Sequence, residues 1–390
     1  MTINITQNND LTITLTWPEK YQSTYHYIWL RDNCPCCRHP QTNHRIIETS
    51  TLPLEIVPIE VSVDETLKII WPDKHVSFFS FDWLKKYDYT NYEPYKNDPI
   101  ILWNRSNFDQ LPSFDFSPML NYCFSGKKDN SFNKTLHEML EGFYKYGVIF
   151  IKNIPTSQID VIDIASMFGY IRETNWGKTY HVKSYANANS VAYTNLSLFG
   201  HTDDPYRDPI ATAQLSLFIK NSSTGGESTM CDGFKIAQDM KLLYPEYFKI
   251  LTTTPVHFYL KDKNNIFESI KTIIELDCLG DVRCIRYSNH SAQPFNVPVD
   301  QMYDFYTAYQ MFASMRENPK YKFEIKMNEG DFYMIDNTRI LHGRSEYSVS
   351  NGERDIHGCF MEKDQILSQL KLNESKQGDY WKYWLKMARY

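Results

Sequence analysis

The stretch Gly200-His201-Thr202-Asp203-Asp204-Pro205-Tyr206 places a histidine and a carboxylate two residues apart. If this segment is extended, His201 and Asp203 point to the same side, because side chains alternate along a strand. A second histidine, His342, comes far downstream, after an expected turn at residues 336–338. Two histidines and one carboxylate form the facial triad that holds non-haem Fe(II) and leaves coordination positions open. We therefore predict that His201, Asp203 and His342 bind one metal ion.

The sequence around this motif predicts a strand-rich fold. Short apolar segments with strand character lie at residues 148–151, 190–194, 212–219, 273–276, 282–287, 323–327, 331–335 and 355–360. Helical periodicity lies at residues 136–144, 159–167 (with Thr156 as the expected cap), 234–243 and 299–315. Many strands with long excursions between them are typical of a jelly roll of two sheets. The expected fold class is mostly β with flanking helices (α+β), and the expected catalytic domain is a double-stranded β-helix over residues 101–390.

A separate β-rich domain is expected over residues 1–100. Alternating or apolar segments predict strands at residues 11–17, 25–30, 54–57, 67–71 and 76–80. Residues 86–118 are rich in Tyr, Asn, Asp and Pro and lack sustained periodicity. We interpret that segment as a linker or a wrapping segment, which places the boundary near residue 100.

Three cysteines cluster within this first domain, at Cys34, Cys36 and Cys37. Together with His75, which opens a predicted strand, they would complete a tetrahedral Cys₃His zinc site. All four positions would then be filled by protein, so the role would be structural. His39 is a substitute ligand if the adjacent Cys36 and Cys37 cannot both face one metal. The alternative is a group of free surface thiols.

Arg354 follows His342 by twelve residues and opens another predicted strand. Residues 354, 356, 358 and 360 share one face of that strand by parity. A fork-shaped guanidinium on the pocket face suits the bidentate binding of a carboxylate.

Composition excludes several other functions. The chain of 390 residues carries a net charge of −6, which argues against nucleic acid as its main partner. It has no run of eighteen apolar residues, so no transmembrane helix and no membrane partner are expected. Its first residues resemble neither a secretory signal nor an Arg-rich presequence, and a cytoplasmic protein is expected.

Several motifs in order carry a resemblance to a known family. They are Trp29-Leu30-Arg31-Asp32-Asn33-Cys34, Trp71-Pro72-Asp73, Val191-Ala192-Tyr193-Thr194, His201-Thr202-Asp203, Gly225-Gly226-Glu227-Ser228, Asp232-Gly233-Phe234, Asp336-Asn337 and His342-Gly343-Arg344. The chain resembles the γ-butyrobetaine and trimethyllysine dioxygenases, which depend on Fe(II) and 2-oxoglutarate and belong to the taurine-dioxygenase superfamily. The resemblance covers nearly the whole length.

The resemblance implies roles for individual residues. His201, Asp203 and His342 would bind Fe(II), and Arg354 would pair with the distal carboxylate of 2-oxoglutarate. Ser228 would contact the same co-substrate. Oxygen (O2) would convert 2-oxoglutarate to succinate and CO2 while the substrate is hydroxylated. A homodimer is also implied by the family.

The resemblance further implies an aromatic cage for a trimethylammonium group, which the negative faces of aromatic rings attract. The cage positions are Trp176, Tyr180, Tyr193 and Phe360. Asp204 stands where the butyrobetaine enzyme has a further cage tyrosine. Ser190 and Asn289 are the candidate polar contacts to the other end of the substrate. The cysteine motif is also shorter than the family's usual Cys-x-Cys-x-x-Cys.

The leading hypothesis is therefore an Fe(II)- and 2-oxoglutarate-dependent hydroxylase of a small quaternary amine, with γ-butyrobetaine to L-carnitine as the first choice. N6-trimethyllysine and trimethylaminoethylphosphonate are alternative substrates. A non-catalytic metal-binding or scaffold protein of the same fold would have lost a triad residue or Arg354, and neither is lost. A hydrolytic zinc enzyme is disfavoured, because the clustered cysteines would fill the metal's coordination sphere.

Overall fold

The structure is a computed structural model that describes residues 3–92, 96–183, 195–348 and 352–376. It contains two compact units, the first ending at Lys96 and the second beginning at Asn97. The division falls near residue 100. Within the described ranges, no helix is both long enough and apolar enough to cross a membrane.

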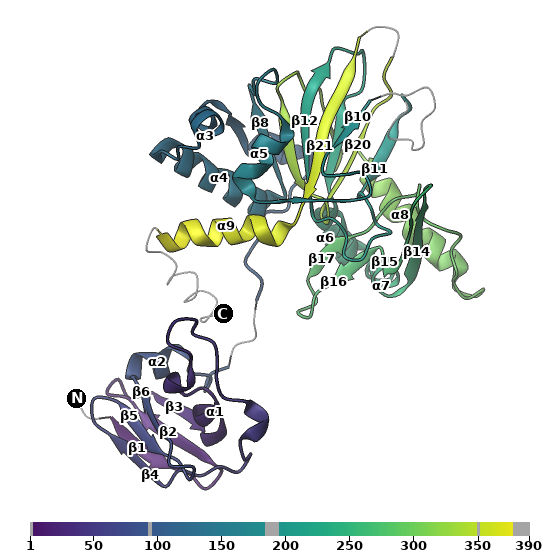
Figure 1. Cartoon of the computed structure of the whole chain (residues 1–390). Helices are drawn as coiled ribbons and strands as arrows, with labels where there is room; N and C mark the ends of the chain where they lie inside the picture. The colour runs from purple at the N-terminus through teal and green to yellow at the C-terminus, as the bar shows by residue number, and fades with distance from the viewer. Residues whose placement is uncertain (1–2, 93–95, 184–194, 349–351, 377–390) are drawn as a thin grey trace. The chain divides into compact units, whose positions relative to one another are not determined.

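The first unit consists of two antiparallel sheets and short helices (Figure 1). One sheet has the order β1 (Asn4–Gln7), β2 (Thr12–Thr16) and β3 (Gln22–His26), and the other has the order β4 (Glu60–Val63), β5 (Leu67–Ile70) and β6 (Val76–Phe79). The helices are α1 (Tyr27–Asp32) and α2 (Phe81–Lys86). Trp17 and Trp71 are among the residues that the sheets bury between them. Each indole donates its N–H to a buried serine, so neither large ring leaves an unpaired donor in the core.

Two of the strands predicted in this unit are wrong. Residues 25–30 leave the strand at His26 and continue as α1, in which Tyr27, Leu30 and Arg31 are buried. Their i, i+3, i+4 spacing is that of a helix, and it outweighs the β propensity of the aromatic residues. Residues 54–57 form no strand, since Leu54 is 81% exposed and too little of the segment is buried to fix it on a sheet.

The second unit is built on two sheets. The larger has the order β10 (Tyr180–Val182), β21 (Arg354–Met361), β12 (Ala213–Asn221), β19 (Phe332–Asp336), β8 (Val148–Lys152) and β7 (Ser113–Asp115), with β9 (Ile171–Arg172) beside β21. The smaller has the order β11 (Leu198–His201), β20 (Ile340–Arg344), β13 (Ser228–Asp232) and β18 (Phe323–Ile325). Non-consecutive strands are neighbours in both sheets, as the jelly roll prediction requires. The predicted strand at residues 190–194 lies outside the described residues.

The larger sheet is buried on both faces, which explains its nearly continuous apolar strands. In β8, Ile149 and Ile151 pack under helices, whereas Val148 and Phe150 face the interior between the sheets. The covering helices are α3 (Leu120–Ser125), α4 (Asn130–Tyr146), α5 (Val161–Phe168) and α9 (Lys363–Lys376) (Figure 1). The cap of α5 is Asp160 rather than the predicted Thr156, because its carboxylate accepts the N–H groups of the first turn.

A second helical layer covers the outer face of the smaller sheet. It contains α6 (Gly233–Leu243), α7 (Pro245–Thr253) and α8 (Met302–Glu317), with the hairpins β14 (Pro255–Lys261) with β15 (Ile266–Thr272) and β16 (Ile274–Leu276) with β17 (Val282–Ile285). Cys231 and Leu341 point into this layer. Because side chains alternate, their neighbours Met230 and His342 face the interior of the jelly roll.

Candidate active site

The smaller sheet and the segment that follows β11 bring His201, Asp203 and His342 together. His201 ends β11 and lies directly opposite His342 of β20 in the antiparallel register. One side-chain ligand atom from each of the three residues lies within 4.8 Å of the others. The Nε2 atom of His201 is 3.2 Å from Asp203 Oδ1, and that of His342 is 3.5 Å from Asp203 Oδ2. The three residues therefore converge as a facial triad would.

Hydrogen bonds and charge prepare these groups for a cation. The Nδ1 atom of His201 lies 2.9 Å from the carbonyl oxygen of Phe199, which fixes the proton on Nδ1 and leaves the Nε2 lone pair for a metal. Burial by itself raises the pKa of Asp203. The neighbouring rings of His342 and His201 together lower that pKa by more than burial raises it, so the net pKa lies far below the ordinary value. The carboxylate is thus ionised when a metal arrives.

The backbone of Asp203 is held by the fully buried Asn337. The N–H of Asp203 donates to Asn337 Oδ1 at 2.7 Å, and Asn337 Nδ2 donates to the carbonyl oxygens of Asp203 and Ala211 at 3.0 and 2.8 Å. On the other side, Arg316 of α8 donates to the carbonyl oxygen of Gly200 at 2.8 Å. These bonds hold the main chain at Gly200 and at Asp203, on either side of His201, and so preorganise the triad.

A cavity of about 430 Å³ opens beside the triad. Its aromatic lining residues are Trp176, Tyr180, Tyr206, Tyr259, Tyr333 and Phe360. Its polar lining residues besides the triad are Thr202, Asp204, Gln214, Ser216, Ser228, Ser288, His290, Ser291, Arg344 and Arg354. The volume lies within the range of small-molecule sites.

Arg354 is suited to hold an anion in this cavity. It begins β21, is 8% exposed, and its Nε and Nη1 atoms are buried without a hydrogen-bond partner among the described residues. Burial, and then the nearby Arg354, lower the pKa of Arg344 to about 10. Two buried guanidinium groups repel each other, and a negative charge between or beside them would stabilise both. Ser228, on β13, lines the same cavity. The residues present therefore fit a dicarboxylate such as 2-oxoglutarate.

Aromatic side chains form part of the cavity wall. Arg354, Ile356 and Phe360 line the cavity from one face of β21, as the parity of that strand predicts. The ring centroids of Tyr180 and Phe360 are 5.3 Å apart. Gly358 lies against Tyr180, and a Cβ atom there would come within 2.7 Å of Tyr180 Cε2. A glycine is therefore needed for the Tyr180 ring to occupy its place.

Four of the predicted substrate contacts remain predictions, because two lie outside the described residues and two lie in surroundings that the predicted role did not anticipate. Ser190 and Tyr193 lie outside the described residues. Asn289 does not line this cavity: its side-chain oxygen accepts the Tyr309 hydroxyl at 2.5 Å, and it faces a separate depression beside α8. Asp204 does line the cavity, but Tyr206 donates to its Oδ1 at 2.5 Å and Arg207 to its Oδ2 at 3.1 Å. An acid already paired in this way is poorly suited to attract a substrate cation.

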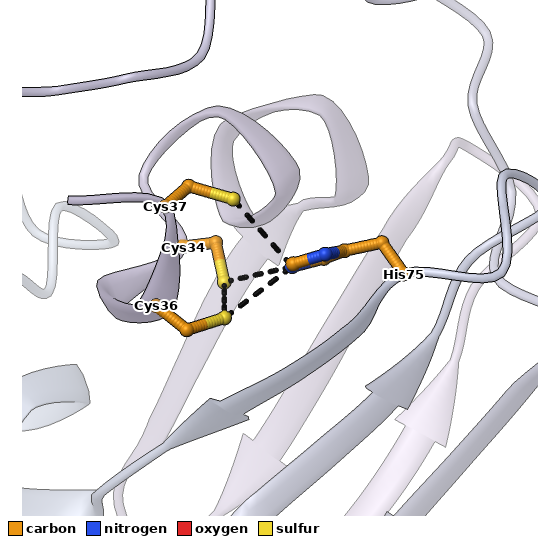
Figure 2. A group of neighbouring side chains, drawn as sticks. All are labelled: Cys34, Cys36, Cys37 and His75. Carbon is orange, nitrogen blue, oxygen red and sulfur yellow. Dashed lines mark hydrogen bonds between the residues drawn. The ribbon is translucent and has the colours of Figure 1, made fainter. Parts of the chain in front are cut away.

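The first unit contains a second candidate metal site, drawn in Figure 2. The Sγ atoms of Cys34, Cys36 and Cys37 lie 3.4, 3.3 and 3.5 Å from His75 Nε2. All four ligand atoms lie within 4.8 Å of one another, and the three thiols are free of disulfides. His39 is not in this group, since its Nδ1 accepts the backbone N–H of Thr42.

The surroundings of the cysteine cluster favour a bound cation with thiolate ligands. Burial and the neighbouring thiols raise the pKa of Cys36 to about 12, so this thiol keeps its proton unless a positive charge lies beside it. Arg31 lies with Nη1 3.4 Å from Cys37 Sγ and is fixed by a 2.7 Å ion pair with Asp73. Asp73 also accepts the backbone N–H of His75, which holds the main chain of the fourth ligand in place. Tetrahedral zinc fits this donor set.

Sequence reasoning missed several residues of the active site. Gln214 donates to Asp203 Oδ2 at 2.7 Å, and the ring of His290 lies 6.2 Å from that of His201. The sequence places Asn337 in an expected turn and in the Asp336-Asn337 motif, without a role in the site. The available signal for Gln214 was its polarity at an inward-facing position of an apolar strand. The position of Asn337 beside Asp203 arises from a contact across 134 residues, which local patterns do not show.

Comparisons with known proteins agree with this geometry. The family model described as Taurine catabolism dioxygenase TauD, TfdA family, matches residues 122–360, and one described as Gamma-butyrobetaine hydroxylase-like, N-terminal, matches residues 4–85. The gamma-butyrobetaine dioxygenase of Pseudomonas sp. (strain AK-1) is 30% identical over 92% of this chain and 92% of its own. Human trimethyllysine dioxygenase, a mitochondrial protein, is 31% identical over 90% of this chain and 84% of its own. Human gamma-butyrobetaine dioxygenase is 31% identical over 92% and 93%.

One solved structure supports the fold. Asparagine oxygenase, in complex with Fe(II), 2S,3S-3-hydroxyasparagine and succinate, superposes with a TM-score of 0.50 over 68% of this chain and 94% of its own, at 11% identity. At that identity the likeness concerns the fold alone. The family match covers more than half of the chain, and the chain therefore belongs to the TauD, TfdA dioxygenase family. It is a 2-oxoglutarate-dependent dioxygenase that uses Fe(II).

Proposed function

We propose that this dioxygenase hydroxylates a small quaternary amine, with γ-butyrobetaine as the substrate and L-carnitine as the product. The observation that carries the proposal is the aromatic wall of Trp176, Tyr180 and Phe360 in the same cavity as the triad. The faces of aromatic rings attract a trimethylammonium group, and this cation has no N–H that would need a hydrogen-bond acceptor. Relatives that share 30 to 31% identity over about nine-tenths of this chain are named for trimethylammonium substrates, which supports the same substrate class here.

Each group in the site would have a distinct task. His201, Asp203 and His342 would hold Fe(II), which with 2-oxoglutarate and O2 supplies the oxidising power for C–H hydroxylation. Arg354 would bind the distal carboxylate of 2-oxoglutarate through its guanidinium group, whose Nε and Nη1 have no partner among the described residues, with Ser228 beside it. The aromatic wall would orient the substrate so that one carbon faces the metal, and its apolar surface would exclude water.

The charges of the cavity favour butyrobetaine over trimethyllysine. Trimethyllysine carries an additional α-ammonium group, which needs a carboxylate partner when buried. The carboxylates that line the described cavity are Asp203, which belongs to the triad, and Asp204, which is bonded to Tyr206 and Arg207. Residues 184–194, outside the described ranges, contain no Asp or Glu. Neither the described lining of the cavity nor residues 184–194 therefore supply an unpaired carboxylate for a second ammonium group.

A turnover screen with γ-butyrobetaine, N6-trimethyllysine and trimethylaminoethylphosphonate tests the proposal. Succinate release and the mass of the product are measured for each amine. The proposal predicts that γ-butyrobetaine stimulates succinate release most and gains one oxygen. A preference for either alternative would change the substrate but keep the class, whereas no stimulation by any amine, with 2-oxoglutarate bound, would refute a quaternary amine as the substrate.

The proposal includes a structural zinc ion held by Cys34, Cys36, Cys37 and His75. Four protein ligands fill a tetrahedral sphere, so the ion would stabilise the first unit and take no part in the reaction. Metal analysis of the purified protein should find one zinc per chain. A cytoplasmic homodimer is the expected working form, and its mass in solution checks the dimer.

A further inference from the structure

Gln214 is the hydrogen-bonded link between the triad and the aromatic wall. Its Nε2 lies 2.7 Å from Asp203 Oδ2 and 3.1 Å from the hydroxyl oxygen of Tyr180. An amide nitrogen carries two hydrogens, and this geometry uses both. One side chain thus contacts a candidate metal ligand and a candidate cage residue at the same time.

The orientation of this amide is set by its partners. Asp203 Oδ2 can only accept a hydrogen bond, so the amide nitrogen must face it, and a flipped amide would bring two oxygens together. The Oε1 atom of Gln214 is then buried without a hydrogen-bond partner in the described part of the chain. A buried acceptor without a partner lowers stability. The two hydrogen bonds that the Gln214 amide donates therefore come with a buried acceptor that lowers the stability of the strand.

The backbone around Gln214 makes the side chain a rigid connection. Gln214 lies in β12, where its Cα pairs with that of Phe360 on β21 and that of Ile335 on β19. Both neighbouring strands fix the main chain, and Phe360 carries the ring that packs against Tyr180. A displacement of the Tyr180 hydroxyl can therefore reach Asp203 through a single fixed side chain.

We propose that Gln214 is a positioning residue that couples occupation of the substrate cage to the geometry of the metal-binding carboxylate. An oxygen that already accepts an N–H at 2.7 Å is the poorer metal ligand, so the bond to Oδ2 directs Oδ1 to the metal. Binding through one oxygen leaves the open positions that a facial triad must provide. The inference rests on the proposed roles of Asp203 and Tyr180.

The test compares Gln214→Met, which keeps the length but donates nothing, with Tyr180→Phe, which removes only the distal end of the link. Gln310→Met, at an exposed position of α8, is the matched control. Three properties are measured: the Mn(II) dissociation constant in the absence of substrate, the ratio of hydroxylated product to succinate, and Tm. Mn(II) stands in for Fe(II) and reports the site without turnover.

Gln214→Met is expected to weaken Mn(II) binding about tenfold or more and to lower the product-to-succinate ratio. Its Tm should be kept or raised, because the unpartnered Oε1 is removed as well. Tyr180→Phe should bind Mn(II) as the wild type does and lower the ratio. The double variant should give the ratio of Gln214→Met alone, since both changes break one link.

Unchanged Mn(II) affinity and an unchanged ratio in Gln214→Met would overturn the inference. If that variant does not fold, Gln214→Asn retains the amide but is one methylene too short to span both partners, and the same losses are expected of it. If no quaternary amine is hydroxylated, the ratio of product to succinate cannot be measured. The Mn(II) dissociation constant of Gln214→Met then decides alone whether Gln214 positions the carboxylate. Hydroxylation of a quaternary amine together with unaltered Mn(II) binding in Gln214→Met would refute the role of Gln214 and keep the proposed function.

Discussion

The two candidate metal sites of this chain differ in how they are built. In the cysteine cluster, three candidate ligands lie within four consecutive positions. The fourth, His75, directly precedes β6. In the triad, His201 and His342 are brought together by pairing of β11 with β20, across some 140 residues. The first offers four protein ligand atoms, which could close around an ion, whereas the second offers three and opens on a cavity. The number of ligands thus separates a structural ion from a reactive one.

Their surroundings differ in the same sense. The cysteine cluster is supported by a short local network, Arg31 with Asp73 and His75. The triad is supported by buried amides, Asn337 at the backbone of Asp203 and Gln214 at its carboxylate. The triad therefore depends on the jelly roll as a whole, and the cluster depends on one small unit. The following predictions test this contrast from the largest expected effect to the smallest.

His201→Ala should reduce succinate formation to the background rate. It removes one of three metal ligands from a site that has no protein ligand to spare. Circular dichroism and Tm should stay near those of the wild type, because the side chain serves the site rather than the core. The zinc content should also be unchanged. Retained iron-dependent turnover in this variant would contradict the assigned triad.

Arg354→Met should raise the KM for 2-oxoglutarate roughly 30-fold or more, since losing one partner of a buried charge pair costs about 2–5 kcal/mol. The KM for the amine should change much less. Arg283→Met, at a side chain that is 61% exposed, is the control and should leave both constants unaltered. Equal changes in both constants for Arg354→Met would mean that the guanidinium does not serve the co-substrate.

Cys36→Ser should release zinc and destabilise the first unit by several kcal/mol, because metal binding and folding are coupled in small metal-stapled units. Metal analysis and thermal unfolding followed by tryptophan fluorescence measure the two effects. Cys278→Ser, at an exposed cysteine outside the cluster, should alter neither. Zinc content that survives Cys36→Ser would show that this thiol is not a ligand.

Trp176→Ala and Phe360→Ala should each raise the KM for the amine by about 2- to 30-fold, as expected for about 0.5–2 kcal/mol of cation–π attraction. The KM for 2-oxoglutarate should change far less. Tyr303→Ala, at a ring that is 89% exposed on α8, serves as the control. Similar losses for both ligands would argue that these rings support the cavity as packing and do not form a cage.

Sequence predicted several strands of the jelly roll that are buried on both faces, but it gave no strand at β13 or β20, which are buried as well and carry more polar residues. The apolar runs of β8, β12 and β19 carry that signal in their own residues. It failed where tertiary contacts decide the local structure, as in α1, where Tyr27 and Leu30 pack at helical spacing. The hairpin of β14 and β15, whose exposed and buried residues do not form a continuous apolar run, was not predicted at all.

The same limit holds for the candidate site. Residue type and spacing pointed to His201, Asp203, His342 and Arg354, because metal and carboxylate binding require those chemical groups. The hydrogen bonds of Gln214 and Asn337 to Asp203 could not be predicted, since they join residues of different strands and loops. For Asp204 the sequence suggested a substrate contact, and its ion pair with Arg207 could not be known from the motif.

Anaerobic addition of 2-oxoglutarate to the Fe(II)-loaded protein tests the central contrast most directly. A keto acid that chelates Fe(II) gives a visible charge-transfer band, and this requires open positions on the metal. The band should form in the wild type and in Cys36→Ser, if that variant is assayed below its unfolding temperature, and it should be absent from His201→Ala. A band that persists in His201→Ala, or that is lost in folded Cys36→Ser, would contradict the assignment of the open site to the triad.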